Sequence, residues 1–189
     1  RQLADDFAFV LRTSLRHGLK LFPSLIDFHW CCEGKMLPGG MVKGGRHDLI
    51  RDPGKRKRFL DLTLAPLLGI SAAHPEAIFA WELINEPEWA VRARFSRGKN
   101  ANQTLSAPEM KDFLREGAAM VRRRWSEGRT GAPRASVGFA RRQSIEGWRS
   151  EELGITLHQF HCYSRPIPPL HEDSEGNPCV VGEIPTAGG

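Results

Sequence analysis

Short apolar segments alternate with amphipathic segments along most of this chain, and this alternation limits the folds that it can adopt. The apolar segments have the length and composition of strands that are buried on both faces of a sheet. Strands and helices that alternate with short connections produce a parallel α/β sheet, either open and doubly wound or closed as a barrel. The predicted strands span residues 19–28, 77–84, 135–140, 155–163 and 179–182. The predicted helices span residues 3–17, 53–68, 106–125 and 143–153.

Local signals indicate where two of these helices begin. Asp52 and Pro53 make a favourable N-cap and first-turn pair. Ser106 and Glu109 form a capping box, in which each side chain accepts from the backbone amide of the other residue. Both signals precede apolar residues spaced three and four apart, so both mark genuine helix starts.

Proline and glycine indicate where regular structure is interrupted. Pro23 lies inside the first predicted strand and predicts a bend there, because proline cannot donate to a hydrogen-bond ladder. The glycine-rich residues 31–48 and the polar residues 87–105 are expected to be loops, as are the proline-rich residues 164–178.

The length of 189 residues suits one compact domain, expected to cover residues 1–189. It is short for a full eight-unit barrel, for which about 250 residues are typical. No run of about 18 apolar residues is present, so no association with a membrane is expected. No signal-peptide pattern opens the chain, which leaves its location undetermined. The cysteines, expected to be reduced thiols, are Cys31, Cys32, Cys162 and Cys179.

The formal net charge of +5 raises the question of nucleic-acid binding. The two densest basic runs are residues 55–58 and residues 122–124. Both lie within helical patterns whose apolar residues recur three and four positions apart. Solvated outer faces of helices explain such runs better than a nucleic-acid surface, so no nucleic-acid partner is expected.

Two glutamates occupy equivalent places in the pattern. Glu86 and Glu183 each follow the carboxyl end of a strongly apolar predicted strand. In parallel α/β architectures the carboxyl ends of the strands form the rim where ligands bind. Cleavage of a glycosidic bond requires two carboxyl groups that flank it, one to protonate the leaving oxygen and one to attack the anomeric carbon. The ends of two barrel strands could supply both groups, but a single glutamate at a strand end is more often a salt-bridge partner or a solvated loop residue.

The segment from Trp81 to Pro87 resembles the fourth-strand signature of clan A glycoside hydrolases, particularly family 5. The segment from Pro178 to Glu183 is similar to the seventh strand of that family. The resemblance implies a (β/α)8 barrel of the TIM type and a retaining mechanism. It also implies that Glu86 is the general acid/base, that Glu183 is the nucleophile, and that Asn85 contacts the sugar 2-hydroxyl.

Further substrate contacts follow from the same resemblance. His161 and Tyr163 match the His-x-Tyr pair of the sixth strand, and strand alternation places both on one face. His29 lies where the third strand of the family often carries an Asp-x-His element. Trp30 and Trp89 are candidates for stacking against pyranose rings. For Trp30, packing in the hydrophobic core is a strong alternative.

Only strands three to seven of the family's barrel have counterparts in this chain. The chain is therefore expected to be an excerpt of a longer polypeptide, or a truncated barrel whose open edges pair in a homo-oligomer. The expected partner is an oligo- or polysaccharide cleaved at β-glycosidic bonds. The alternative is a catalytically weak or inactive barrel that binds carbohydrate. Retention would require the two carboxyl groups to lie about 5 to 5.5 Å apart.

The chain also contains residues that could bind a metal ion, namely His29, Cys31, Cys32, His161 and Cys162. Candidate ligands occur near two strand ends, but none of the paired Cys-x2-Cys spacings of zinc sites is present. No metal and no cofactor are therefore expected.

Overall fold

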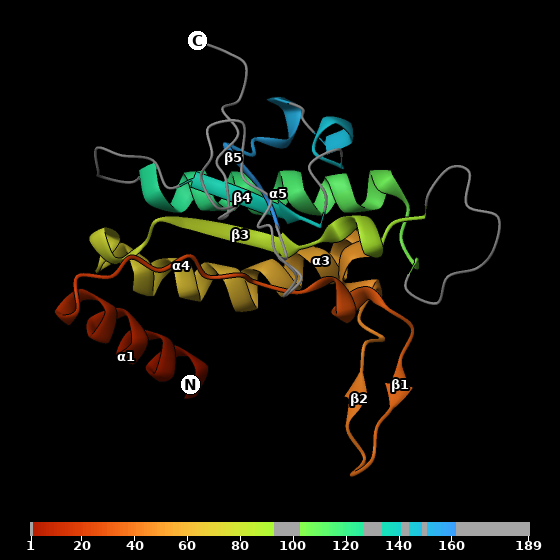
Figure 1. Ribbon diagram of the computed structural model, residues 1–189, viewed down its shortest axis with the longest axis horizontal. Helices are drawn as coiled ribbons and strands as arrows, with labels where there is room; N and C mark the ends of the chain where they lie inside the picture. Colours follow the sequence, from red (N-terminus) through yellow and green to blue (C-terminus); the bar gives the residue numbers. More distant parts are fainter. Residues whose placement is uncertain (1, 93–102, 127–133, 141–143, 149–150, 162–189) are drawn as a thin grey trace, which may run out of the picture.

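The computed structural model describes residues 2–92, 103–126, 134–140, 144–148 and 151–161. Three strands within these residues form one parallel sheet: β3 (Ala80–Asn85), β4 (Arg134–Phe139) and β5 (Leu157–Phe160). Their order in the sheet follows the sequence, with β4 between the other two (Figure 1). The predicted parallel α/β sheet is thus confirmed, but the described strands form an open sheet and not a closed barrel. The strand predicted over residues 179–182 lies outside the described residues.

The segment predicted as the first strand runs parallel to β3 without forming a regular strand. Three isolated bridges hold it there, joining Leu21 to Ile78, Ser24 to Glu82 and Asp27 to Asn85. Pro23 interrupts the ladder because it has no amide to donate, although its carbonyl accepts from the amide of Glu82 at 3.0 Å. The ladder is thus interrupted at this proline, and the segment still extends the sheet beyond β3.

The long helices agree closely with the predicted ranges, and one short helix, α2 (Asp48–Arg51), was not predicted. The other helices are α1 (Gln2–Arg16), α3 (Pro53–Phe59), α4 (Ala65–Ala72) and α5 (Ala107–Ser126), and a π-helical segment η2 (Leu60–Leu64) joins α3 to α4. The prediction over residues 143–153 is wrong, because that region contains two short 3-10 turns, η6 (Glu146–Trp148) and η7 (Glu151–Leu153). So short a segment, with Gly147 inside it, forms too few helical hydrogen bonds to offset nucleation. None of the described helices is long and apolar enough to cross a membrane.

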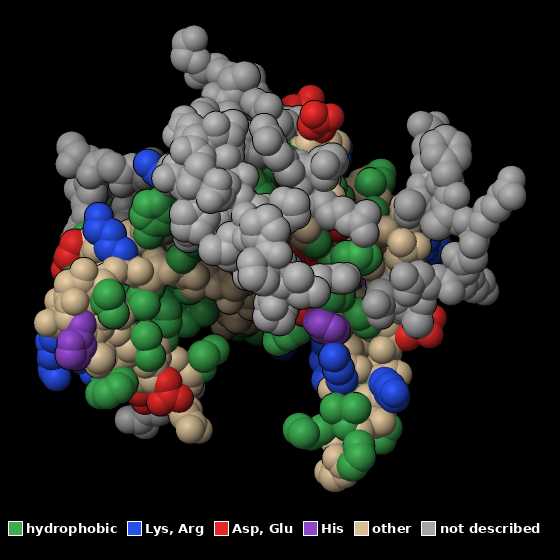
Figure 2. Space-filling view, in the orientation of Figure 1, with side chains coloured by type: hydrophobic (Ala, Val, Ile, Leu, Met, Phe, Trp, Pro, Cys, Tyr) green, Lys and Arg blue, Asp and Glu red, His purple; other side chains and the backbone are tan. Residues whose placement is uncertain are grey.

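Residues 31–48 contain a small hairpin where the sequence predicted only a loop. Strand β1 (Lys35–Met36) pairs antiparallel with β2 (Val42–Lys43). Gly39 and Gly40 both have positive φ between the two strands, a conformation that glycine adopts without strain. The hairpin extends away from the sheet (Figure 1). Its exposed apolar side chains are Met36, Met41 and Val42 (Figure 2).

The two faces of β3 differ in polarity. Leu83 faces α5, where a Cβ on Gly117 would lie 3.0 Å from the leucine Cδ2 atom. Trp81 packs against Phe7 of α1 with ring centroids 5.6 Å apart. Glu82 lies on the opposite face, where it is buried among polar side chains. The helices therefore cover an apolar face, whereas the other face carries the polar groups of the site.

One residue of the basic run 55–58 is buried, which corrects the prediction of a fully solvated face. The side chain of Arg56 is 5% exposed and pairs with Glu116 of α5 at 2.7 Å. Its guanidinium also donates to the carbonyl of Ile50 at 2.7 Å. The other three members of the run are solvated, as are residues 122–124. A basic side chain thus joins α3 to α5 where the sequence pattern indicated only surface charge.

The predicted capping box is present at the start of α5. The amide of Ser106 donates to the Glu109 carboxyl at 2.6 Å, and the amide of Glu109 donates to the serine hydroxyl at 3.4 Å. Ser106→Ala should lower the free energy of unfolding by about 1 kcal/mol, because an amide loses its acceptor. Ser106→Thr retains a hydroxyl and should recover most of this loss. Urea denaturation of the two variants measures the difference, and equal losses would contradict a capping role.

Candidate active site

A β-bulge near the end of β3 determines which side chains reach the site. Glu82 pairs in register with Ser136 of β4, but the next pair joins Asn85 to Gly138. A regular parallel ladder would instead place Ile84 beside Gly138. Because of the extra residue, the polar Asn85 lies beside Gly138 at the end of the sheet in place of Ile84. Bulges often redirect a side chain in this way beside functional sites.

Glu86 follows the bulge in a left-handed backbone conformation, with φ of 50° and ψ of 53°. It is the only non-glycine residue with positive φ in the described part of the chain. Its amide donates to the carbonyl of Gly138 at 2.8 Å, and the 3-10 turn η4 (Pro87–Trp89) begins directly after it. This conformation costs an L-residue about 1 to 2 kcal/mol. The surrounding contacts therefore hold Glu86 in a strained position.

This strain predicts an unusual order of stability at position 86. Glu86→Gly should be more stable than Glu86→Ala by about 1 kcal/mol, because glycine has no Cβ to oppose positive φ. At the helical position Asp112 in α5 the order should reverse, with alanine more stable than glycine by about 1 kcal/mol. Unfolding free energies of the four variants test this. If alanine is the more stable residue at both positions, Glu86 is not strained.

Glu86 is 7% exposed, and its carboxyl group is held at both oxygens. Nδ1 of His161 lies 2.6 Å from Oε1, and the indole Nε1 of Trp89 donates to Oε2 at 3.1 Å. These two contacts fix the orientation of the carboxyl group at the end of the sheet.

Asn85 and His29 are joined through Asp27, a residue that the sequence prediction missed. The Asn85 amide donates to one Asp27 oxygen at 2.7 Å, while the other oxygen lies 2.5 Å from Nδ1 of His29. Asp27 also caps the 3-10 turn η1 (Phe28–Cys31) by accepting from the His29 amide. Burial alone would raise the pKa of Asp27, but the hydrogen bonds from Asn85 and His29 outweigh it and lower that pKa. The Asp-x-His pattern was visible in the sequence, but only its histidine was predicted.

The structure brings together most of the predicted residues that it describes. Asn85, Glu86, Trp89 and His161 lie at one end of the sheet, with His29 attached through Asp27. Trp30 is 43% exposed and packs against Phe59 of α3 at 6.2 Å, so it is neither a core residue nor in this cluster. Glu183 and Tyr163 lie outside the described residues.

Two further carboxyl groups lie near the site, the buried Glu82 and the half-buried Glu88, and the sequence did not single them out. Glu88 accepts from the amide of Ala140 at 2.7 Å and so ties η4 to the end of β4. Glu82 accepts from the Gln159 amide at 2.5 Å. Burial raises the pKa of both carboxyls above the ordinary value. Glu82 is the lone acidic residue in an apolar predicted strand, and this signal could have revealed its buried carboxyl group from the sequence.

No group of three or more metal-ligating side chains is found among the described residues. Cys31 and Cys32 are free and buried. Burial, with smaller contributions from Cys32 and Asp27, raises the pKa of the Cys31 thiol to about 12. A thiol that stays protonated is a poor metal ligand and a poor nucleophile. These cysteines therefore act as small apolar residues behind the site.

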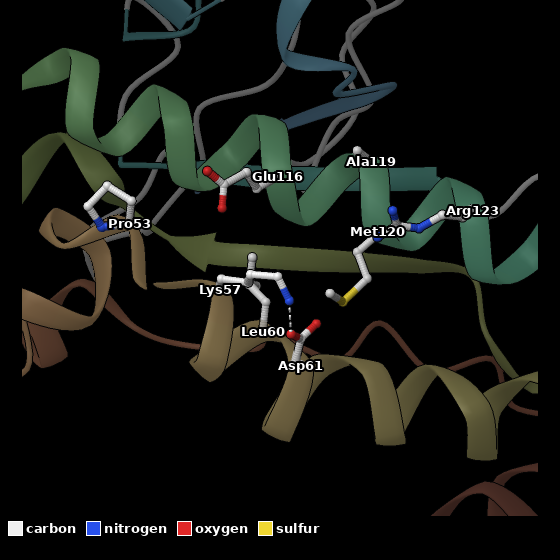
Figure 3. Close-up of a pocket in the computed structure, with 8 residues that line it drawn as sticks. All are labelled: Pro53, Lys57, Leu60, Asp61, Glu116, Ala119, Met120 and Arg123. Carbon is white, nitrogen blue, oxygen red and sulfur yellow. Dashed lines mark hydrogen bonds and ion pairs between the residues drawn. The ribbon is translucent and has the colours of Figure 1, made fainter. Parts of the chain in front are cut away.

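A groove of about 500 Å³ lies between the helices on the other face of the sheet (Figure 3). It is lined by Pro53, Lys57, Leu60, Asp61, Glu116, Ala119, Met120 and Arg123. Lys57 and Asp61 form an ion pair across part of its wall at 2.5 Å. All its lining residues come from helical segments, whereas the Glu86 cluster lies at the strand ends. The groove is therefore separate from the candidate active site.

Comparison with known proteins identifies the fold. No protein-family model and no curated protein matches the chain. Among solved structures, the endo-1,4-β-mannanase from Eisenia fetida matches 86% of the chain with a TM-score of 0.64 and 20% identity. The β-1,4-mannanase from the sea hare Aplysia kurodai matches 92% with a TM-score of 0.62 and 17% identity. The β-mannanase from the blue mussel Mytilus edulis matches 72% with a TM-score of 0.55 and 20% identity.

These matches cover 49%, 55% and 39% of the three mannanases, so the chain spans about half of their length. At such low identity the likeness concerns the fold. It agrees with the order of elements observed here, in which parallel strands alternate with helices and a site lies at their carboxyl ends. The resemblance found in the sequence is therefore confirmed for the fold, which is similar to part of the fold of these mannanases.

Proposed function

We propose that this chain carries a retaining β-glycosidase site in which Glu86 is the general acid/base and Glu183 is the nucleophile. The observation that carries this proposal is the setting of Glu86. Its buried carboxyl is held by His161 and Trp89 at a strand end, beside Asn85. A general acid must be fixed within reach of the atom that it protonates, and these contacts fix it.

The proposed reaction has two steps. In the first, Glu86 gives its proton to the glycosidic oxygen as that oxygen leaves the anomeric carbon, and a Glu183 carboxylate oxygen bonds to the same carbon. In the second, the Glu86 carboxylate takes a proton from water, and the water oxygen displaces Glu183. Two displacements restore the original β configuration.

The proposed substrate is a β-1,4-linked mannan. The names of the structurally similar proteins support this choice, since they are described as β-1,4-mannanases. Asn85 and His29 offer polar contacts to sugar hydroxyls, with their orientations set by Asp27. Trp89 supplies an aromatic face beside Glu86. Trp30 is a candidate for a more distant subsite, because it is exposed.

Hydrolysis of β-1,4-manno-oligosaccharides, followed by proton NMR from the first minutes, tests the proposal. Retention predicts that the β-anomer of the new reducing end forms first and then mutarotates. If the α-anomer forms first, the double-displacement mechanism is wrong.

Binding of the oligosaccharide without cleavage would favour the alternative, a carbohydrate-binding barrel without turnover. We also expect the open sheet edges to pair with a second copy, which sedimentation equilibrium would detect.

A further inference from the structure

Three side chains converge above the backbone of Gly138 in the centre of the sheet. A Cβ at Gly138 would overlap Oε1 of Glu82 and would lie 2.8 Å from Nε2 of His161 and 3.1 Å from Nε2 of Gln159. The absence of a side chain at this glycine is therefore what lets these groups meet. The other ring nitrogen of His161 contacts Glu86 at 2.6 Å. The imidazole thus lies between two buried carboxyl groups, one near each of its nitrogens.

We propose that Glu82 is a positioning residue that controls, through His161, how readily Glu86 releases its proton. This inference rests on the acid/base role proposed for Glu86. An ionised Glu82 favours the imidazolium form of His161, and an imidazolium beside Glu86 favours the ionised form of Glu86. A neutral Glu82 leaves the imidazole neutral, which lets Glu86 keep the proton that it must deliver.

The surroundings of Glu82 move its ionisation to a higher pH than that of an exposed glutamate. Burial raises its pKa, although Ser24, His161, the Gly138 amide and Gln159 act in the opposite direction. Glu82 and Glu86 both interact with His161, and Glu88 interacts electrostatically with Glu86. The ionisation of Glu82 should therefore contribute to the loss of activity at alkaline pH.

Glu82→Gln tests this coupling, because the amide has nearly the same shape but carries no charge. The NMR signals of the His161 imidazole, assigned with His161→Gln, should change at a lower pH in this variant than in the unmutated chain. With a manno-oligosaccharide substrate, the alkaline limb of the pH profile of kcat/KM should move upward, because Glu86 keeps its proton longer. Glu76→Gln, at an exposed position before β3, is the matched control and should change neither value.

Gln159→Met provides a second test if Glu82→Gln folds poorly. Loss of the amide that donates to Glu82 disfavours its ionised form, so His161 should again titrate lower, by a smaller amount. A His161 titration unchanged from the Glu76→Gln control in both variants would overturn the inference. If the unmutated chain shows no hydrolysis while the His161 shift is present, the coupling stands and the proposed glycosidase activity is wrong.

Discussion

Glu86→Ala should lower kcat on β-1,4-mannan by about 10²- to 10⁴-fold, the range expected when a general acid/base is removed. The loss should be largest for natural substrates, since their leaving oxygen requires a proton. With a dinitrophenyl glycoside, whose leaving group needs no proton, the first step should proceed and the covalent intermediate should accumulate. Stopped-flow absorbance would then show a rapid burst followed by slow turnover.

Azide distinguishes the roles of the two glutamates. In Glu86→Ala, azide needs no general base, so it should restore turnover and give a β-glycosyl azide. In Glu183→Ala it should attack from the side of the missing nucleophile and give the opposite anomer. Glu76→Ala, at an exposed position, is the control and should behave as the unmutated chain. A Glu86→Ala variant that cleaves natural mannan at the unmutated rate would remove the basis for the assignment.

Glu116→Ala should lower the free energy of unfolding by about 3 kcal/mol, which is large for one substitution in a domain of this size. The variant leaves the buried Arg56 guanidinium without the carboxyl that lies 2.7 Å away. The hydrogen bond to the Ile50 carbonyl remains, but a neutral acceptor compensates a buried charge only in part. Guanidinium or urea denaturation measures the loss.

Removal of the buried charge should reverse most of this effect. The double variant Arg56→Met/Glu116→Ala should be more stable than Glu116→Ala, because methionine fills the same space without requiring a counter-charge. Asp112→Ala breaks the exposed pair with Arg115 on the same helix and should cost less than about 1 kcal/mol. If Glu116→Ala costs no more than Asp112→Ala, burial of Arg56 does not govern the stability of the contact between α3 and α5.

Helix starts and strand order could be predicted because short-range signals govern them. The capping box of Ser106 and Glu109 and the N-cap of Asp52 act within one turn of the helix that they begin. Hydrophobic periodicity likewise indicates which segments become buried strands. Since Asn85 and Glu86 directly follow such a strand, their place at its carboxyl end was also predictable.

The geometry of the site depended on residues far apart in the chain. Neighbouring strands set the bulge that places Asn85 beside Gly138 and the left-handed conformation of Glu86. No local pattern encodes the contact of Asp27 with Asn85, which are 58 residues apart. The contact of Glu82 with Gln159 likewise joins residues that are far apart in the sequence.

The sequence was therefore sufficient for the long helices, the described parallel strands, their order and the place of Glu86 at a strand end, because these follow from periodicity and from signals within one or two turns. Register, burial of Arg56, and the hydrogen bonds that orient the site came only with the folded chain. These properties depend on the free energy of contacts between distant segments, and such contacts exist only once the segments have packed together.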